Sequence, residues 1–346
     1  MIHVEDLETP TPVIDLDRVE ANLRKMQSYA DAHGLRLRPH IKTHKIPEFA
    51  QRQIELGAVG ITCQKLGEAE VMADAGIQDV LISYPLVGVG KAERLAALAS
   101  RIRMSVAIDS EEALQTAIQA SKSAEIGVWV EFDSGAKRTG VATVEEALRL
   151  IERVRSFARL RFEGLMTYPM TEQSGKFFAE AAAKTDIPAF SAAGTPVAWS
   201  SHEIPGLTEI RHGTYIYHDR STVGAGAARL DECAVDVLAT VVSRPTGGRF
   251  ILDSGSKTLS SDRIPEGMGK GFGLIREYPA ATIERLYEEH ALATLPKGQP
   301  EPKVGERVRV LPNHVCVVSN LHDEIPVARQ GMVVGTVKVA GRGKTR

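Results

Sequence analysis

Residues 104–132, MSVAIDSEEALQTAIQASKSAEIGVWVEF, contain a complete strand–helix–strand unit and decide the fold. Apolar runs at the two ends of this stretch flank a segment, 110–121, whose apolar residues recur at helical spacing after a capping serine. Repeated units of this kind predict a parallel sheet. About eight of them fit a (β/α)8 TIM-type barrel. A doubly wound sheet is the alternative, but it would need a glycine-rich turn after its first strand, and Asp15-Leu16-Asp17 provides none.

The same patterns predict the individual elements of the barrel. Apolar runs predict strands at 12–15, 35–38, 59–62, 80–83, 104–108, 126–132, 162–166 and 209–211. Apolar residues at i, i+3 and i+4 predict helices at 17–32, 46–56, 66–74, 89–101, 110–121, 144–158 and 176–183. We therefore assign residues 11–228 to the barrel.

After Arg229 the pattern changes to short strands separated by Gly, Pro and Asp turns. These strands are expected at 234–242, 249–252, 281–283, 307–311, 315–318 and 332–339. The pattern is typical of an antiparallel β-domain, which we assign to residues 229–346 together with 1–10.

Composition excludes several classes of protein. The chain has 346 residues and a formal net charge of −2, which argues against nucleic-acid binding and against attraction to anionic membranes. No apolar run is long enough to cross a bilayer, and the acidic start lacks the basic region of a signal peptide. Three cysteines are too few for a disulfide scaffold. We expect a cytoplasmic enzyme or binding protein that acts on a small molecule and has no nucleic-acid or membrane partner.

The segment Arg38-Pro39-His40-Ile41-Lys42-Thr43-His44-Lys45 concentrates basic side chains directly after a predicted strand. Crowding by like charges favours the neutral amine of a lysine, and a neutral amine attacks an aldehyde to form an imine. In a barrel the carboxyl ends of the strands form the active-site face, and Lys42 falls there. A solvated basic turn is the alternative interpretation.

Other polar side chains fall at equivalent strand ends. Gln64 follows the strand at 59–62, Arg138 lies in the loop after 126–132, and Tyr168 follows 162–166. Each one taken alone also fits a helix cap or a turn. Their shared location at one end of the barrel favours a single site.

Two later stretches combine glycine with hydroxyl groups. Gly194 and Thr195 lie in a loop of small residues, and Gly213 and Tyr215 follow shortly after it. Late loops of a barrel often present main-chain N–H groups to a phosphate, although the same composition also makes ordinary turns.

Pro312-Asn313-His314-Val315-Cys316 offers two metal-binding side chains. In a β-strand, side chains two residues apart share a face, so His314 and Cys316 can reach one ion. Two protein ligands leave positions open for substrate and water, as in a catalytic metal site. A thiolate with an imidazole favours Zn²⁺, with Mn²⁺ or Mg²⁺ as alternatives. A structural histidine beside a buried cysteine is the other interpretation.

Taken in order along the chain, these motifs resemble a known family. The stretch 38–45, Gly194-Thr195-Pro196, Gly213-Thr214-Tyr215, Asp253-Ser254-Gly255-Ser256-Lys257 and the stretch 312–316 are similar to motifs of the D-threonine aldolase/D-serine dehydratase family. The barrel of that family resembles the barrel of alanine racemase. The first and last motifs are the specific ones.

The resemblance implies a lyase that uses pyridoxal 5′-phosphate (PLP) and a divalent cation to act on D-β-hydroxy amino acids. It implies catalytic roles for Lys42, His40 and Tyr168, with Lys42 binding the cofactor covalently. It implies that the residues around the cofactor are Gln64, Arg138, Tyr168, Gly194, Thr195, Gly213 and Tyr215, and that His314 and Cys316 are the metal ligands. Relatives with this fold are commonly dimers, so the resemblance also implies a homodimer.

The resemblance leaves two reactions open. Removal of the proton of the substrate hydroxyl leads to Cα–Cβ cleavage and yields glycine plus an aldehyde, whereas removal of the α-proton leads to loss of hydroxide and yields a 2-oxo acid plus ammonia. Cys316 stands where many aldolases carry aspartate, which favours a dehydratase, but Asn320-Leu321-His322-Asp323 looks aldolase-like. We favour the aldolase. A non-catalytic PLP carrier and an amino-acid racemase are the alternatives from other classes.

Overall fold

The computed structural model describes residues 2–245 and 247–346, which form two compact units. One, here called the barrel unit, comprises residues 25–42, 47–213 and 343–346. The other, the β-unit, comprises the described residues of 1–24, 43–46 and 214–342. The chain passes from the β-unit into the barrel unit within helix α1 (Leu16–Ala32).

The barrel unit contains eight parallel strands in the order β2-β9-β8-β7-β6-β5-β4-β3. They are β2 (Arg36–Leu37), β3 (Ile61–Cys63), β4 (Asp79–Ile82), β5 (Arg103–Ile108), β6 (Ile126–Phe132), β7 (Leu160–Thr167), β8 (Phe190–Ala192) and β9 (Glu209–Ile210). A parallel bridge between His40 and Thr62 joins the two ends of this order, so the curled sheet closes. The predicted (β/α)8 architecture is confirmed.

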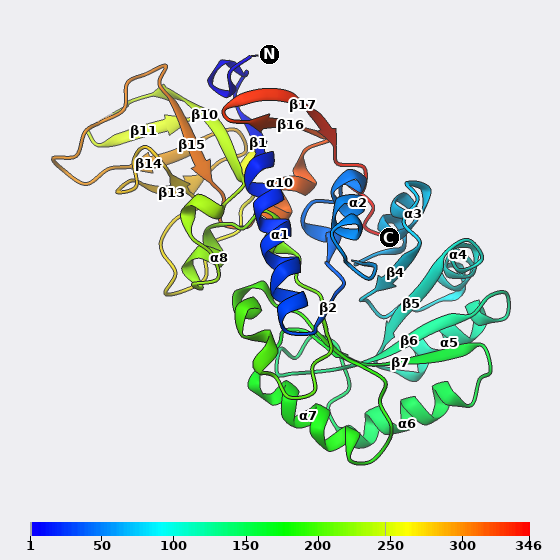
Figure 1. Cartoon of the computed structure of the whole chain (residues 1–346). Helices are drawn as coiled ribbons and strands as arrows, with labels where there is room; N and C mark the ends of the chain where they lie inside the picture. The colour runs from blue at the N-terminus through cyan, green and yellow to red at the C-terminus, as the bar shows by residue number, and fades with distance from the viewer. Residues whose placement is uncertain (1, 246) are drawn as a thin grey trace. The chain divides into compact units, whose positions relative to one another are not determined.

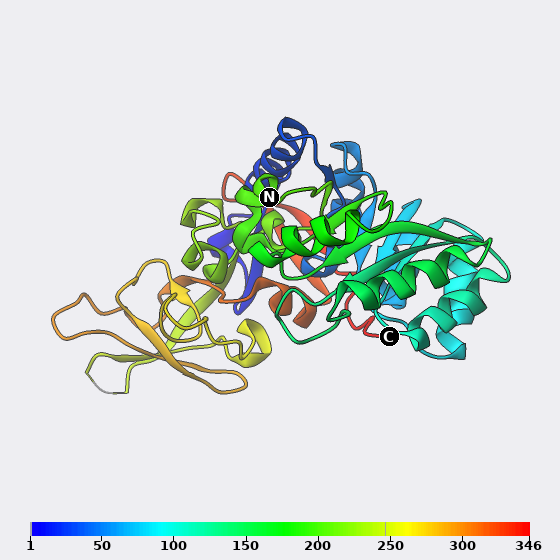
Figure 2. The same ribbon diagram turned by 90° about the horizontal axis from the view of Figure 1, so that it is seen from below.

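Helices cover the outer face of these strands (Figures 1 and 2). They are α2 (Pro47–Glu55), α3 (Leu66–Asp74), α4 (Val89–Ala99), α5 (Glu111–Ser121), α6 (Val144–Arg155) and α7 (Glu172–Ala182). Their starts follow local sequence signals: Ser110 caps α5 by accepting the N–H of Ala113, and Thr143 with Glu146 forms a capping box at α6. All of the predicted barrel helices are found, with ends that shift by a few residues.

An apolar layer formed by Leu81, Ala107, Trp129, Met166 and Ala189 fills the barrel. The Ala189 carbonyl leaves no room for a side chain at Gly164, and an added Cβ would also lie 3.0 Å from the indole of Trp129. Gly164 also has a φ of 146°, which side chains rarely adopt. Glycine at this position therefore allows the close approach of the Ala189 main chain beside Trp129.

Two strand assignments need correction. The strand predicted at 12–15 exists as β1 (Thr11–Asp15), but it pairs with strands of the β-unit and is not the first barrel strand. The barrel strand missing from the prediction is β8, whose residues we had assigned to the loop of small residues before Thr195. An apolar strand such as β1 fits the interior of either unit, and a three-residue strand such as β8 is too short to show a period.

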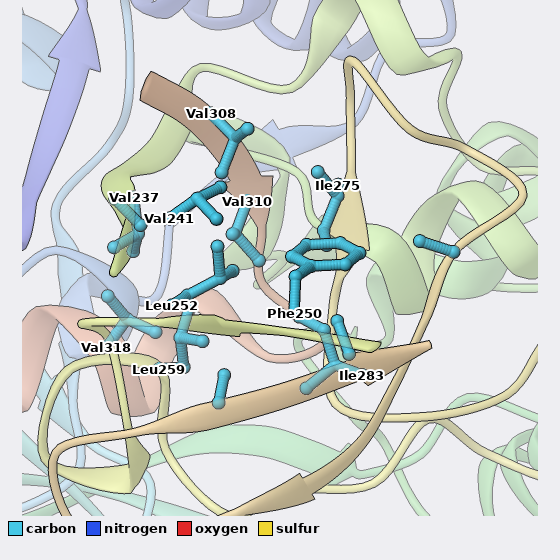
Figure 3. Close-up of a cluster of buried hydrophobic side chains, with 14 residues drawn as sticks. Val237, Val241, Phe250, Leu252, Leu259, Ile275, Ile283, Val308, Val310 and Val318 are labelled. Atoms are coloured by element: carbon cyan, nitrogen blue, oxygen red, sulfur yellow. The ribbon is translucent and has the colours of Figure 1, made fainter. Parts of the chain in front are cut away.

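The β-unit is built on a mixed nine-stranded sheet, with neighbours β13-β14-β11-β10-β1-β16-β17 and with β15 pairing β10 and β12. In addition to β1, the sheet contains β10 (Val235–Ser243), β11 (Arg249–Leu252), β12 (Leu274–Ile275), β13 (Thr282–Leu286), β14 (Ala291–Thr294), β15 (Arg307–Leu311), β16 (Glu324–Arg329) and β17 (Met332–Lys338). Its helices are α8 (Arg220–Gly224), α9 (Ser256–Leu259) and α10 (Val315–Leu321). Figure 3 shows its core, in which Phe250, Ile275 and Ile283 pack against valines of β10 and β15.

The strand predicted at 315–318 is wrong, because these residues begin helix α10. The run Val315-Cys316-Val317-Val318 has the composition of a strand. However, the Asp219 carboxylate accepts the N–H of Val315 at 3.1 Å, which caps the first turn of a helix. This tertiary contact outweighs the local preference of the β-branched residues.

Among the described residues, every helix is too short or too polar to cross a membrane.

Candidate active site

A pocket in the barrel unit brings together five residues singled out from the sequence: His40, Lys42, Gln64, Arg138 and Tyr168. The remaining lining residues are Ser83, Glu131, Met166, Ala193 and Arg211. Most of them lie at or just beyond the carboxyl ends of strands, so the barrel concentrates polar groups from distant parts of the chain at one face.

The ring of Tyr168 contacts two cationic side chains, those of Lys42 and Arg138. The Lys42 Nζ lies 5.3 Å from the centroid of its ring, and the Arg138 guanidinium carbon lies 4.7 Å from the same centroid. A ring face attracts cations, so the contacts with Tyr168 stabilise both side chains. Lys42 and Arg138 therefore contact the same tyrosine ring and line the same pocket.

Both ring nitrogens of His40 are engaged. Nδ1 accepts a hydrogen bond from the main-chain N–H of Lys42 at 3.3 Å, and Nε2 lies 3.0 Å from Gln64 Oε1 and 3.3 Å from Ser83 Oγ. Because an amide carbonyl only accepts, Nε2 carries the proton in this arrangement. His40 thereby orients the short turn η2 (Ile41–Thr43), which carries Lys42.

The glycine-bearing loop lies next to this pocket. Ala193 lines the pocket, and Gly194 caps the 3-10 helix η3 (Thr195–Glu203). The N–H of Gly194 donates to His212, the residue that precedes Gly213. Tyr215 is buried in η4 (Thr214–Ile216), which belongs to the β-unit.

Sequence reasoning missed two buried charges in the pocket, Glu131 and Arg211, each 2% exposed. Burial raises the pKa of Glu131, with the charge of Arg211 opposing, and burial lowers the pKa of Arg211 to about 10. Glu131 Oε2 and Arg211 Nε are buried and have no hydrogen-bond partner. A glutamate inside an otherwise apolar seven-residue strand was the signal that could have revealed Glu131.

Arg211 is held by a chain of buried polar contacts. It donates to Ser191 Oγ at 2.7 Å and to the Thr167 carbonyl at 3.0 Å. Ser191 donates to Glu209 at 2.8 Å, and Glu209 also accepts from Arg38 at 3.3 Å. This network fixes the guanidinium of Arg211 while leaving its Nε free to bind a ligand.

In the β-unit, His314 and Cys316 lie together at the start of α10, and Asp262 joins them. The Asp262 carboxylate lies 2.5 Å from His314 Nδ1. A hydrogen bond to Cys316 raises the pKa of His314 to about 9, with Asp262 adding to the effect. Burial opposes ionisation of Cys316, but hydrogen bonds from His314 and Thr43 lower the pKa of its thiol below its usual value. The predicted pair is thus brought together, although by a helix start and not by a strand.

The residues that follow Lys42 in the chain contact the same helix. Thr43 Oγ1 lies 3.2 Å from Cys316 Sγ, and Lys45 Nζ donates to Asn320 at 2.8 Å. The His44 ring accepts the N–H of Ile46 at 3.0 Å and is fully buried. Thr43, His44 and Lys45 therefore make structural contacts. Lys42 is the lysine of the stretch 38–45 that lines the pocket.

The chemistry of these residues fits PLP and a metal. The orphaned buried atoms of Glu131 and Arg211 are typical of a pocket that binds a polar molecule, and Lys42 offers an amine for an aldehyde. Among the described residues no group of three His, Cys, Asp or Glu has metal-binding geometry. His314 and Cys316 are an imidazole and a thiol, which are ligands that zinc accepts, and Asp262 contacts the second nitrogen of the histidine.

The fold and the family matches define a PLP-dependent enzyme with an alanine racemase-type barrel. Residues 14–221 match the family model of the alanine racemase N-terminal domain, and residues 234–328 match that of a serine dehydratase domain. The chain belongs to the D-threonine aldolase/3-hydroxyaspartate dehydratase family of PLP-dependent lyases.

Individual relatives match over nearly the whole chain. A D-threonine aldolase of Arthrobacter sp. is 35% identical over 98% of this chain and 94% of its own. The structure of a D-threonine aldolase from Filomicrobium marinum superposes with a TM-score of 0.88 at 32% identity, covering 100% of this chain and 98% of that one. A D-threo-3-hydroxyaspartate dehydratase from Delftia sp. HT23 superposes at 0.84 with 28% identity, covering 98% and 99%.

Proposed function

We propose that this protein is a PLP- and divalent-metal-dependent lyase that cleaves D-β-hydroxy amino acids in the manner of a D-threonine aldolase, giving glycine and an aldehyde. The observation that carries the proposal is the combination of Lys42 in the barrel pocket with the His314–Cys316 pair in the β-unit. Likeness to D-threonine aldolases over the whole chain supports the choice of reaction.

The pocket residues would bind the cofactor in distinct ways. When bound, PLP supplies a ring that stabilises negative charge at the substrate Cα. Lys42 would hold the cofactor aldehyde, Arg211 and Glu131 would contact polar atoms of the cofactor from the pocket floor, and the loop at Gly194 and Thr195 would lie by the phosphate. His40 would act by orienting the turn that carries Lys42, because both of its nitrogens are already engaged.

The β-unit residues would bind the metal. When bound, a divalent cation lowers the pKa of the substrate's β-hydroxyl. His314 would ligate through Nε2, because Nδ1 is held by Asp262, and Cys316 would ligate as a thiolate. A thiolate and an imidazole favour Zn²⁺, with Mn²⁺ and Mg²⁺ as alternatives. Solved structures of D-threo-3-hydroxyaspartate dehydratase support this assignment: they include a His-to-Ala variant and, in the metal-free form, a variant in which a cysteine two positions later is replaced by alanine.

The same cysteine favours the second candidate function. A dehydratase on 3-hydroxy-D-aspartate or D-serine would release ammonia and a 2-oxo acid from the same site, and the Delftia enzyme is similar to this chain over 90% of its length at 31% identity. In the pocket, Tyr168 is the residue beside Lys42 that carries an ionisable hydroxyl, and we propose it as the group that exchanges a proton with the substrate.

Product analysis tests the proposal. The purified chain is incubated with D-threonine, D-serine or D-3-hydroxyaspartate, each with Zn²⁺, Mn²⁺, Mg²⁺ or EDTA. We expect glycine from D-threonine with a divalent metal and none with EDTA. Ammonia with a 2-oxo acid would establish the dehydratase instead, and D/L interconversion without cleavage would establish a racemase. A homodimer and a cytoplasmic location remain predictions, the first testable by light scattering.

A further inference from the structure

His212, two residues beyond β9, links the glycine-bearing loop to the barrel. Its Nδ1 accepts a hydrogen bond from the main-chain N–H of Gly194 at 3.2 Å, and its Nε2 lies 3.0 Å from Ser201 Oγ. Ser201 donates its own proton to the carbonyl of Ala198 at 2.8 Å, so it accepts from Nε2. The ring therefore bridges both ends of η3, from Gly194 at its cap to Ser201 near its end.

The imidazole of His212 is neutral at assay pH. The residue is 1% exposed, and burial together with the charge of Arg211 lowers its pKa to about 3. Only a neutral ring can accept a hydrogen bond at Nδ1, because both nitrogens of an imidazolium are donors. The contact to Gly194 is thus maintained through the neutral range.

The main chain of His212 links two other segments that we assign to the cofactor site, the turn that carries Lys42 and the residues at Gly213. Its carbonyl accepts the N–H of His40 at 3.0 Å, and His40 in turn orients the turn of Lys42. Gly213 follows it directly. One buried residue therefore connects the lysine turn, the glycine-bearing loop and Gly213.

The contact to Gly194 also determines the donors that the loop can offer. Because the N–H of Gly194 is used by His212, this glycine shapes the loop and does not donate to a ligand. Its φ of 150° is one that other residues rarely adopt. Thr195 is the first residue of η3, so its N–H has no acceptor within the helix and is directed out of its start.

We propose that His212 is a positioning residue for the cofactor phosphate: it holds the loop 194–196 in the conformation that binds a phosphate monoester. The inference rests on the proposed function, since it takes PLP as the cofactor. The competing explanation is a buried histidine that supports the barrel in general. The two explanations make different predictions. If His212 positions the loop, its replacement weakens only ligands that carry a phosphate; if it supports the barrel in general, its replacement weakens ligands with and without a phosphate.

The experiment compares PLP with pyridoxal, which has the same ring and aldehyde but no phosphate. Equilibrium dialysis of the cofactor-depleted full chain gives the Kd of each ligand for the wild type, His212→Phe, His212→Asn and Ser201→Ala. We expect His212→Phe to raise the Kd for PLP about tenfold, because the variant leaves the buried N–H of Gly194 without an acceptor. The Kd for pyridoxal should not change. His212→Asn keeps an acceptor near Nδ1 and should stay within about threefold of wild type for both ligands.

Ser201→Ala keeps the inference testable if His212→Phe does not fold. It frees Nε2 without removing the ring, and it should lower the ratio of PLP to pyridoxal affinity by about threefold. Equal losses for both ligands, or an unchanged ratio in both variants, would overturn the inference while the proposed function stands. A wild-type chain that binds neither ligand would instead overturn the proposed function, and the inference with it.

Discussion

The barrel pocket and the His314–Cys316 cluster are built in opposite ways. The pocket is formed by residues from seven different strand ends, and its central charges, Glu131 and Arg211, are each 2% exposed. The metal cluster is formed by one helix start and one loop residue, and the side chains of His314 and Asp262 are 45% and 44% exposed. The central charges of the first site are buried, whereas two side chains of the second are partly exposed to solvent. We infer that cofactor binding and metal binding can be disrupted separately, and the predictions below test that separation.

The largest effect is expected for Lys42→Ala. Removal of the pocket amine should lower activity on the order of 10⁴-fold and abolish the visible absorbance of the lysine-bound cofactor. Activity assays and absorbance spectra of the purified variant measure both. Lys65→Ala is the matched control, because Lys65 also follows a barrel strand but lies over the ring of Tyr84, at 3.5 Å. Borohydride trapping that labels Lys45 in place of Lys42 would show that the assignment is wrong.

His314→Ala should disrupt metal binding and leave cofactor binding intact. We expect activity to fall on the order of 10²-fold to 10³-fold, since the metal contributes several kcal/mol to the reaction, while the visible absorbance of the cofactor persists. EDTA treatment of the wild type should reproduce this pattern, because the site is open to solvent. If absorbance and activity disappeared together in the variant, His314 would have a structural role and the two sites would not be separable.

Asp262→Asn sharpens the comparison within the metal cluster. The carboxylate at 2.5 Å from Nδ1 orients the ring and increases its basicity as a ligand. Its loss should weaken metal affinity about 10-fold to 100-fold, measured by competition with a chelator, with no change in cofactor absorbance. Asp323→Asn is the control, because that carboxylate accepts from Arg342 and is 83% exposed. An unchanged metal affinity would leave Asp262 without a role in the site.

Much of this arrangement was predictable from the sequence, and the failures have physical causes. The (β/α)8 architecture followed from the alternation of patterns, but β1 was placed in the wrong unit because its apolar run fits either interior. His314 and Cys316 were found by residue type, although their helix depends on a cap from Asp219, which lies far away in the chain. Glu131 and Arg211 were missed, because only the folded barrel shows that their charges share one pocket.

The smallest effect expected is a pH dependence of stability that comes from His212 in the barrel. Its pKa is about 3 in the folded chain and about 6.5 in an unfolded one. Below pH 6.5 the unfolded state therefore takes up a proton that the folded state does not, so stability falls as pH falls from 6.5 towards 3. Between pH 7.5 and 5.5 the loss of stability should be about 1.4 kcal/mol.

His212→Phe should lack this part of the loss, as measured by urea unfolding at both pH values. His290→Phe, which removes an exposed histidine of the β-unit, should lose as much stability as the wild type. Equal slopes for His212→Phe and the wild type would mean that His212 takes up its proton in the folded chain as readily as in the unfolded one.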